Sequence, residues 1–104
     1  MKIAPGEVSA RALYVDRFGN IQLNATAADM CAAGLEPGGR LRVGARGKPY
    51  EASYVRAFAD APKRALLVYV DSYEAITLAV NGGSAAAALS LSAGASVTLR
   101  RTEG

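Results

Sequence analysis

The sequence contains no histidine and a single cysteine, Cys31. A single cysteine excludes an internal disulfide, and without histidine a zinc or iron site lacks its usual ligands. Histidine is also the side chain that most readily exchanges protons near neutral pH. A complete acid–base enzyme in this chain would have to use Asp, Glu, Lys or Tyr. These absences favour a binding role, and we predict no catalytic residue, no metal site and no cofactor.

Long apolar runs are also absent. The longest, residues 65–70 and 75–80, are far shorter than the roughly 20 residues that a membrane helix needs. The N-terminus, Met1-Lys2-Ile3-Ala4-Pro5-Gly6, lacks the apolar stretch of a secretory signal. We therefore predict no membrane contact and a cytoplasmic location.

The charge is mixed rather than concentrated. Twelve basic residues stand against nine acidic ones, for a net charge of +3. The arginines are scattered, whereas a nucleic-acid binder usually carries a denser basic stripe. With 104 residues, 51% hydrophobic and 20% charged, the chain has the composition and length of one globular domain, residues 1–104.

Short apolar stretches alternate with turn residues along the whole chain. Thr26, followed by Asp29, predicts a helix over 26–33 that ends at Gly34, and Ser84 predicts a second helix over 84–89. Such closely spaced strands leave no room for parallel crossovers. The sequence therefore predicts an all-β fold, a closed antiparallel Greek-key-type barrel of about seven strands with two short helices. The predicted strands are residues 8–16, 20–24, 40–45, 50–58, 65–70, 75–80 and 96–101.

Three motifs stand out from ordinary barrel sequence. They are Tyr-Val-Asp-Arg-Phe-Gly-Asn at 14–20, Tyr-Val-Arg-Ala-Phe at 54–58, and Tyr-Val-Asp-Ser at 69–72 followed by Leu-Ala-Val-Asn-Gly-Gly-Ser-Ala-Ala at 78–86. In this order and spacing they resemble the C-terminal domain of the S-adenosylmethionine hydroxide adenosyltransferases, the family that includes the fluorinase. The resemblance extends from about residue 7 to residue 100.

The resemblance implies a two-domain enzyme that is a homotrimer at full length. Its substrate, S-adenosylmethionine, would lie between this domain and the N-terminal catalytic domain of a neighbouring subunit. The reaction would be displacement at the ribose C5′ carbon, giving adenosine and methionine when water attacks. Because nothing in this sequence matches the catalytic domain, we expect the isolated chain to bind S-adenosylmethionine or adenosine without catalysing the reaction.

The first motif supplies three candidate substrate-binding residues. The Asp16 carboxylate can pair with the methionine ammonium, or it can cap a turn. The Asn20 amide can both donate and accept, which matches an adenine edge, although Asn is also common at turns and strand edges. Phe18 lies between them in the same loop. Each is expected at a strand end.

The later motifs supply five more candidates. Phe58 can stack on adenine or pack in the core. Tyr69 can wall the pocket or be a core residue, and Ser72 can donate to the methionine carboxylate. The Asn81 and Gly82 backbone can read adenine, or can simply precede a capped helix. We expect all these residues except Tyr69, together with those of the first motif, to converge on one exposed rim.

One departure from the family pattern concerns the third motif. After its serine the family often has a basic residue and then glycine, where this chain has Tyr73 and Glu74. Three alternatives to S-adenosylmethionine binding therefore stay open. The ligand can have changed to a simple nucleoside, the domain can be a small nucleic-acid-binding barrel, or it can be an oligomerisation module.

Overall fold

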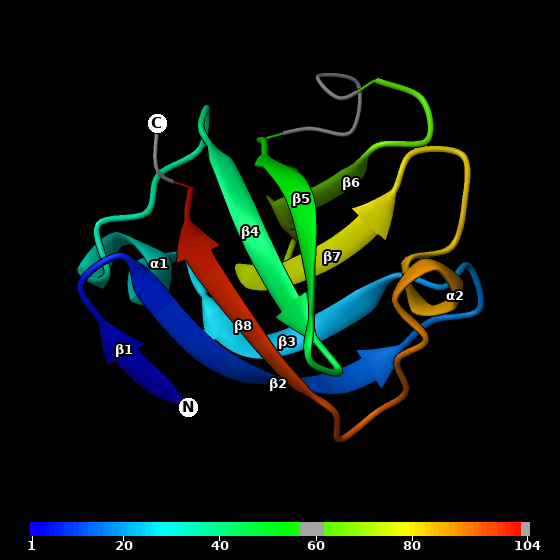
Figure 1. Cartoon of the computed structure of the whole chain (residues 1–104), viewed down its shortest axis with the longest axis horizontal. Coiled ribbons are helices and arrows are strands. Elements are labelled where there is room, and N and C mark those ends of the chain that lie inside the picture. The colour runs from blue at the N-terminus through cyan, green and yellow to red at the C-terminus, as the bar shows by residue number, and fades with distance from the viewer. Residues whose placement is uncertain (57–61, 103–104) are drawn as a thin grey trace.

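The computed structural model describes residues 1–56 and 62–102, which form eight strands and two short helices (Figure 1). Each of the seven predicted strands and both predicted helices has a counterpart. In chain order the elements are β1 (Lys2–Ala4), β2 (Glu7–Val15), β3 (Ile21–Thr26), α1 (Ala27–Ala32), β4 (Arg40–Ala45), β5 (Lys48–Tyr54), β6 (Leu66–Val70), β7 (Ala75–Val80), α2 (Ala85–Leu89) and β8 (Ser96–Arg101).

The strands close into a barrel. Their order is β1-β2-β3-β7-β6-β5-β4-β8, and β2 pairs with β8 to complete the ring of seven, with β1 as an addition beside β2. The predicted closed barrel is thus confirmed, with one correction to its antiparallel character. β5 and β6 pair in parallel through Ser53 with Leu67 and Tyr54 with Val68. Residues 55–65 connect these two strands, and a parallel pair needs such a long connection.

The core follows from the alternation of the strands. In β3, for example, Ile21, Leu23 and Ala25 are buried, while the residues between them face outward. The helices lie at opposite sides of the barrel in Figure 1 and each adds a fully buried side chain, Met30 from α1 and Leu89 from α2. Burying such a side chain contributes about 1.5–3 kcal/mol.

The helix ends are formed by the residues that the sequence predicts. Thr26 and Asp29 make a reciprocal capping box, and the Ser84 side chain accepts from the backbone N–H of Ala87 at 3.1 Å. Gly34 follows α1 at φ +80°, and the N–H of Leu35 returns to the carbonyl of Met30 at 2.9 Å. This Schellman arrangement brings the buried Leu35 against the helix.

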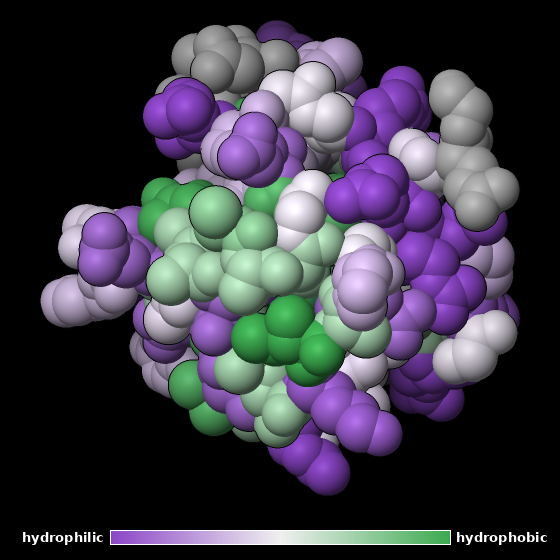
Figure 2. All heavy atoms as spheres, turned by 90° about the vertical axis from the view of Figure 1, so that its left-hand side faces the viewer, coloured by the Kyte–Doolittle hydropathy of each residue, from purple (hydrophilic) through white to green (hydrophobic). Residues whose placement is uncertain are grey.

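The barrel surface differs from side to side. On the outer face of β4 and β5, Arg40 and Arg42 make cross-strand ion pairs with Glu51. Between β8 and β2, Arg100 pairs with Glu7 at 2.7 Å. Figure 2 views the side that carries α1, where a pale green, weakly hydrophobic area is surrounded by hydrophilic residues. The exposed residues of α1 there are Ala28, Cys31 and Ala32.

Candidate substrate-binding face

The first predicted motif forms a tight turn between β2 and β3. Asp16 Oδ1 accepts from the backbone N–H groups of Phe18 at 2.8 Å and Asn20 at 3.0 Å, and its Oδ2 accepts from Asn20 Nδ2 at 3.1 Å. Partial burial alone would raise the pKa of Asp16, but these hydrogen bonds outweigh it and lower the pKa. The carboxylate is therefore ionised and caps its own turn, as the alternative reading of Asp16 expected.

The third motif forms a second turn with the same hydrogen bonds, between β6 and β7. Asp71 Oδ1 accepts from the backbone N–H groups of Tyr73 at 2.8 Å and Ala75 at 3.0 Å. Its Oδ2 accepts from Gln22 Nε2 at 3.0 Å and Thr77 Oγ1 at 3.2 Å. Here too partial burial acts to raise the pKa of Asp71, and the hydrogen bonds lower it.

Each turn also touches the start of a helix. The carbonyl of Gly19 accepts from the N–H of Ala86 in α2 at 2.9 Å, and the carbonyl of Glu74 accepts from the N–H of Ala27 in α1 at 3.2 Å. The backbone N–H groups at a helix start lack partners within the helix. The two turns therefore help to fix the two helices on opposite sides of the barrel.

A polar row crosses the outer face of the barrel between these turns. Gln22 in β3 pairs with Thr77 in β7, which pairs with Tyr69 in β6, so the three side chains are neighbours across three strands. Burial raises the pKa of the Tyr69 phenol, and the carboxylates of Asp71 and Asp16 raise it further. The phenol consequently stays protonated at neutral pH and can donate a hydrogen bond.

The structure separates the predicted residues into two groups. β3 and β7 are antiparallel, with Ile21 opposite Leu78 and Thr26 opposite Ala75. Consequently the Asp16 turn lies beside the end of β7 and the Asp71 turn lies at its beginning. The first group is Asp16, Phe18, Asn20, Asn81 and Gly82; the second is Ser72.

The expectation that these residues converge on one rim is wrong. They are instead distributed along one outer face, with Tyr69 between the two groups and packed beside the buried pair Leu67 and Ala79. Ser72 and Phe18 are exposed. Phe58 lies outside the described residues, so its predicted contact with adenine stays a prediction.

Sequence reasoning missed three residues of this face. Gln22 and Thr77 lie between core residues of their strands, so period-two alternation could have placed them outside. Asp71 belongs to the third motif, and Tyr73 follows it at the same spacing at which Phe18 follows Asp16. That repeated Asp-x-aromatic pattern was the available signal for a second capped turn.

Within residues 1–56 and 62–102, no three His, Cys, Asp or Glu side chains gather closely enough to hold a metal ion. None of the helices in that part of the chain is long and apolar enough to cross a membrane.

The fold and this face define a small closed-barrel domain that carries an uninterrupted polar row over three of its strands. Residues 10–98 match the family model described as the SAM hydroxide adenosyltransferase C-terminal domain. The chain belongs to this family, which confirms the resemblance drawn from its motifs.

Two curated relatives carry the name (R)-S-adenosyl-L-methionine hydrolase. The one from Salinispora arenicola is 43% identical over 86 residues, and the one from Salinispora tropica is 41% identical over 87 residues. Each match covers 83% of this chain but 30% of the relative. The chain thus spans less than a third of the length of these proteins.

Two solved structures share the fold. An uncharacterized conserved protein from Thermotoga maritima superposes with a TM-score of 0.91 at 28% identity, covering 95% of this chain and 38% of that one. A conserved hypothetical protein from Thermus thermophilus gives a TM-score of 0.64 at the same identity and coverage.

Proposed function

We propose that this domain binds the adenosine part of S-adenosylmethionine on the outer face of β3, β7 and β6, as one half of an S-adenosylmethionine hydrolase site. Family membership carries the proposal, because both curated relatives are named as hydrolases of this substrate. The two turns support it, because polar groups lie at both ends of β7, where an elongated ligand with a polar group at each end would need its partners.

The position of each turn suggests which end of the ligand it holds. Asn20 and the loop that follows β7 lie together, because Gly19 contacts Ser84 and its carbonyl accepts from the N–H of Ala86. The Asn20 amide and the backbone of Gly82 would offer hydrogen-bond partners to an adenine edge. The backbone of Asn81 pairs with Arg64 and Ala65, so it would hold Gly82 in position. Ser72 lies at the beginning of β7 and supplies a hydroxyl for the methionine carboxylate. Asp16 belongs to the same group of residues as Asn20, so its negative charge would lie near the adenosine part of the ligand and not beside Ser72.

The relatives extend well beyond the region that matches this chain. The chain covers 30% of their length, and it has no histidine. We therefore propose that the catalytic residues come from an N-terminal domain of a neighbouring subunit in a cytoplasmic homotrimer. We expect no release of adenosine from S-adenosylmethionine by this chain alone.

Titration of the chain with adenosine and with S-adenosylmethionine, followed by backbone amide NMR, tests the proposal. We expect saturable shifts at residues 16–20 and 81–84, and Asn20→Ala should weaken adenosine binding by about 1–3 kcal/mol. Asn24→Ala is the matched control, since it removes the same side chain from the adjoining strand β3. Asn24 accepts from the backbone N–H of Arg11 at 2.9 Å, so its loss should leave affinity unchanged.

Either of two results would count against the proposal. One is the absence of saturable shifts with both ligands. The other is equal weakening by the two asparagine variants, which would indicate a general loss of structure. Binding to oligonucleotides that falls steeply with salt would support the nucleic-acid alternative instead.

A further inference from the structure

The last residue of β5, Tyr54, combines deep burial with an unused hydroxyl. Its side chain is 1% exposed and belongs to the main core, and its backbone pairs with Gly38 and Gly39. The hydroxyl makes no hydrogen bond with any residue in the described ranges. Every fully buried side-chain oxygen of those ranges does have a hydrogen-bond partner. The hydroxyl oxygen is therefore reached from outside the core.

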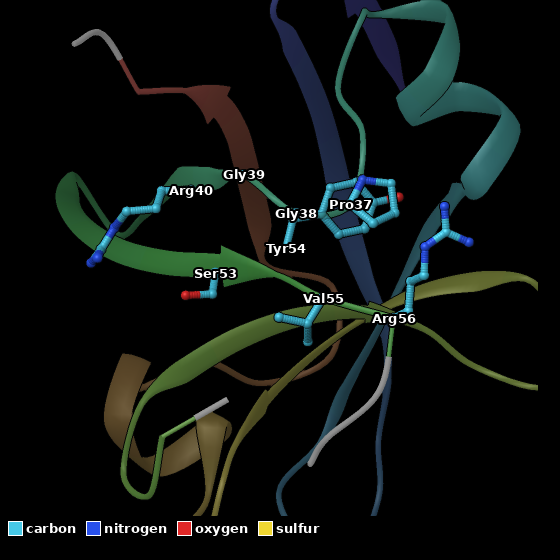
Figure 3. A pocket seen from close by; sticks show the side chains of 8 residues that line it. All are labelled: Pro37, Gly38, Gly39, Arg40, Ser53, Tyr54, Val55 and Arg56. Carbon is cyan, nitrogen blue, oxygen red and sulfur yellow. The ribbon is translucent and has the colours of Figure 1, made fainter. Parts of the chain in front are cut away.

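Two adjoining pockets lead to Tyr54. One has a volume of about 370 Å³ and is drawn in Figure 3, and the other has about 500 Å³. Pro37, Tyr54 and Arg56 line both. In Figure 3 the Tyr54 ring overlaps Pro37, and its hydroxyl end is directed to the side where Arg56 lies. Volumes of roughly 300–1,000 Å³ are typical of small-molecule sites.

The larger pocket joins an apolar wall to a positive charge. Ala27, Cys31 and Val70 supply the accessible apolar surface, and Glu36 lies on the same lining. The exposed Arg56 makes no ion pair with an acidic residue of the described ranges. Its guanidinium therefore keeps its hydrogen-bond donors for a ligand, in a geometry that suits a carboxylate or a phosphate.

Tyr54 is a donor at neutral pH. Burial raises the pKa of its phenol, and the neighbouring charge of Arg56 offsets only part of that rise. A protonated phenol and a guanidinium that border the same pocket both donate to an anion.

We propose that this pocket binds a small organic anion with a single negative charge. Its carboxylate or monoanionic phosphate would accept from Arg56 and from the Tyr54 hydroxyl, and its apolar body would pack on Cys31 and Val70. Glu36 repels a second negative charge, which disfavours dianions. The pocket shares no lining residue with the outer face proposed for S-adenosylmethionine, so this site goes beyond that function.

Benzoate is a suitable probe, with the neutral, isosteric benzamide as its control. Titration of the whole chain, followed by backbone amide NMR, should give saturable benzoate shifts at residues 31–37 and 54–56. Because a hydrogen bond to a charged group is lost, Tyr54→Phe and Arg56→Gln should each weaken binding about tenfold. Benzamide should bind about tenfold more weakly as well.

Arg42→Gln is the matched control for the arginine. Arg42 is exposed on β4 and pairs only with Glu51 among the described acids, at 3.5 Å, so its loss should leave benzoate affinity unchanged. Tyr54→Phe keeps the ring, and its amide spectrum reports whether the core is intact. Shifts scattered over all arginines, equal binding of benzamide, or an unchanged affinity in Tyr54→Phe would each overturn the proposal, as would no binding at all.

Discussion

The turns at residues 16–20 and 71–75 contain the same hydrogen bonds but are embedded differently. Each has a left-handed residue at its fourth position, Gly19 at φ +84° and Glu74 at φ +62°. Gly19 is buried against Ser84, whereas Glu74 is exposed. In contrast, the Asp16 carboxylate bonds only to its own turn among the described residues, while Asp71 also reaches β3 and β7.

This difference shows that a turn and its surroundings are specified separately. The Asp side chain and the local backbone suffice to make the turn, because both copies form it. What the fourth position tolerates depends on the neighbouring chain. The glycine of the family pattern falls on residue 74, where this chain has a glutamate in a backbone conformation that favours glycine. The Glu74 side chain fits there because it is exposed.

The largest expected effect comes from closing the space at Gly19. A Cβ there would overlap the Oγ and Cβ of Ser84 and come within 2.9 Å of its Cα. We expect Gly19→Ala to lower the free energy of unfolding by about 3 kcal/mol. Urea unfolding followed by circular dichroism measures it.

Glu74→Ala is the control, because residue 74 already carries a Cβ in the same conformation. It should change the free energy of unfolding by less than about 0.5 kcal/mol. The backbone cost of a Cβ in this conformation is measured separately by Glu74→Gly. If Gly19→Ala lost no more stability than Glu74→Gly gains, backbone conformation rather than contact with Ser84 would be the cause.

A smaller effect should distinguish the two carboxylates. Asp71→Ala removes bonds to two neighbouring strands and leaves the buried Thr77 hydroxyl without its acceptor. We expect it to cost about 2–3 kcal/mol, against about 1 kcal/mol for Asp16→Ala. Unfolding in urea at pH 7 gives both values, and a larger loss for Asp16 would reverse the comparison.

Acidity tests whether the charge of Asp71 matters. Its pKa is lowered in the folded state, so its contribution is complete above the ordinary value of 3.8 and is lost as the pH falls through the folded pKa. The difference between the natural chain and Asp71→Ala should therefore shrink below about pH 4. A difference that stays constant to about pH 2.5 would mean that the ionised form has no advantage.

The smallest expected effect is a gain. Glu74→Gly relieves the left-handed conformation of a residue with a side chain but adds freedom to the unfolded chain, so we expect about 0.5 kcal/mol of net stabilisation. Ser72→Gly in the same turn is the control, because Ser72 does not have a positive φ and should only lose stability. Thermal unfolding of both variants decides between these outcomes.

Local chemistry in the sequence determined the elements and the family. Thr26, Asp29, Gly34 and Ser84 act within a few residues of themselves, so the helix ends follow from their types. Alternation along the strands fixed which side chains are buried, and the ordered motifs fixed the family. The short strand β1 was missed, because Lys2–Ala4 has neither the length nor the alternation that marks a strand.

Tertiary structure decided which elements meet. Alternation states which face a side chain occupies but not which strand lies beside it, so the parallel pairing of β5 with β6 could not be predicted. For the same reason the Asp16 turn and Ser72 were expected on one rim, although the antiparallel pairing of β3 and β7 puts them at opposite ends of a strand. The contact of Gly19 with Ser84 and the pocket at Tyr54 likewise join segments far apart in the chain, and only the closed barrel brings them together.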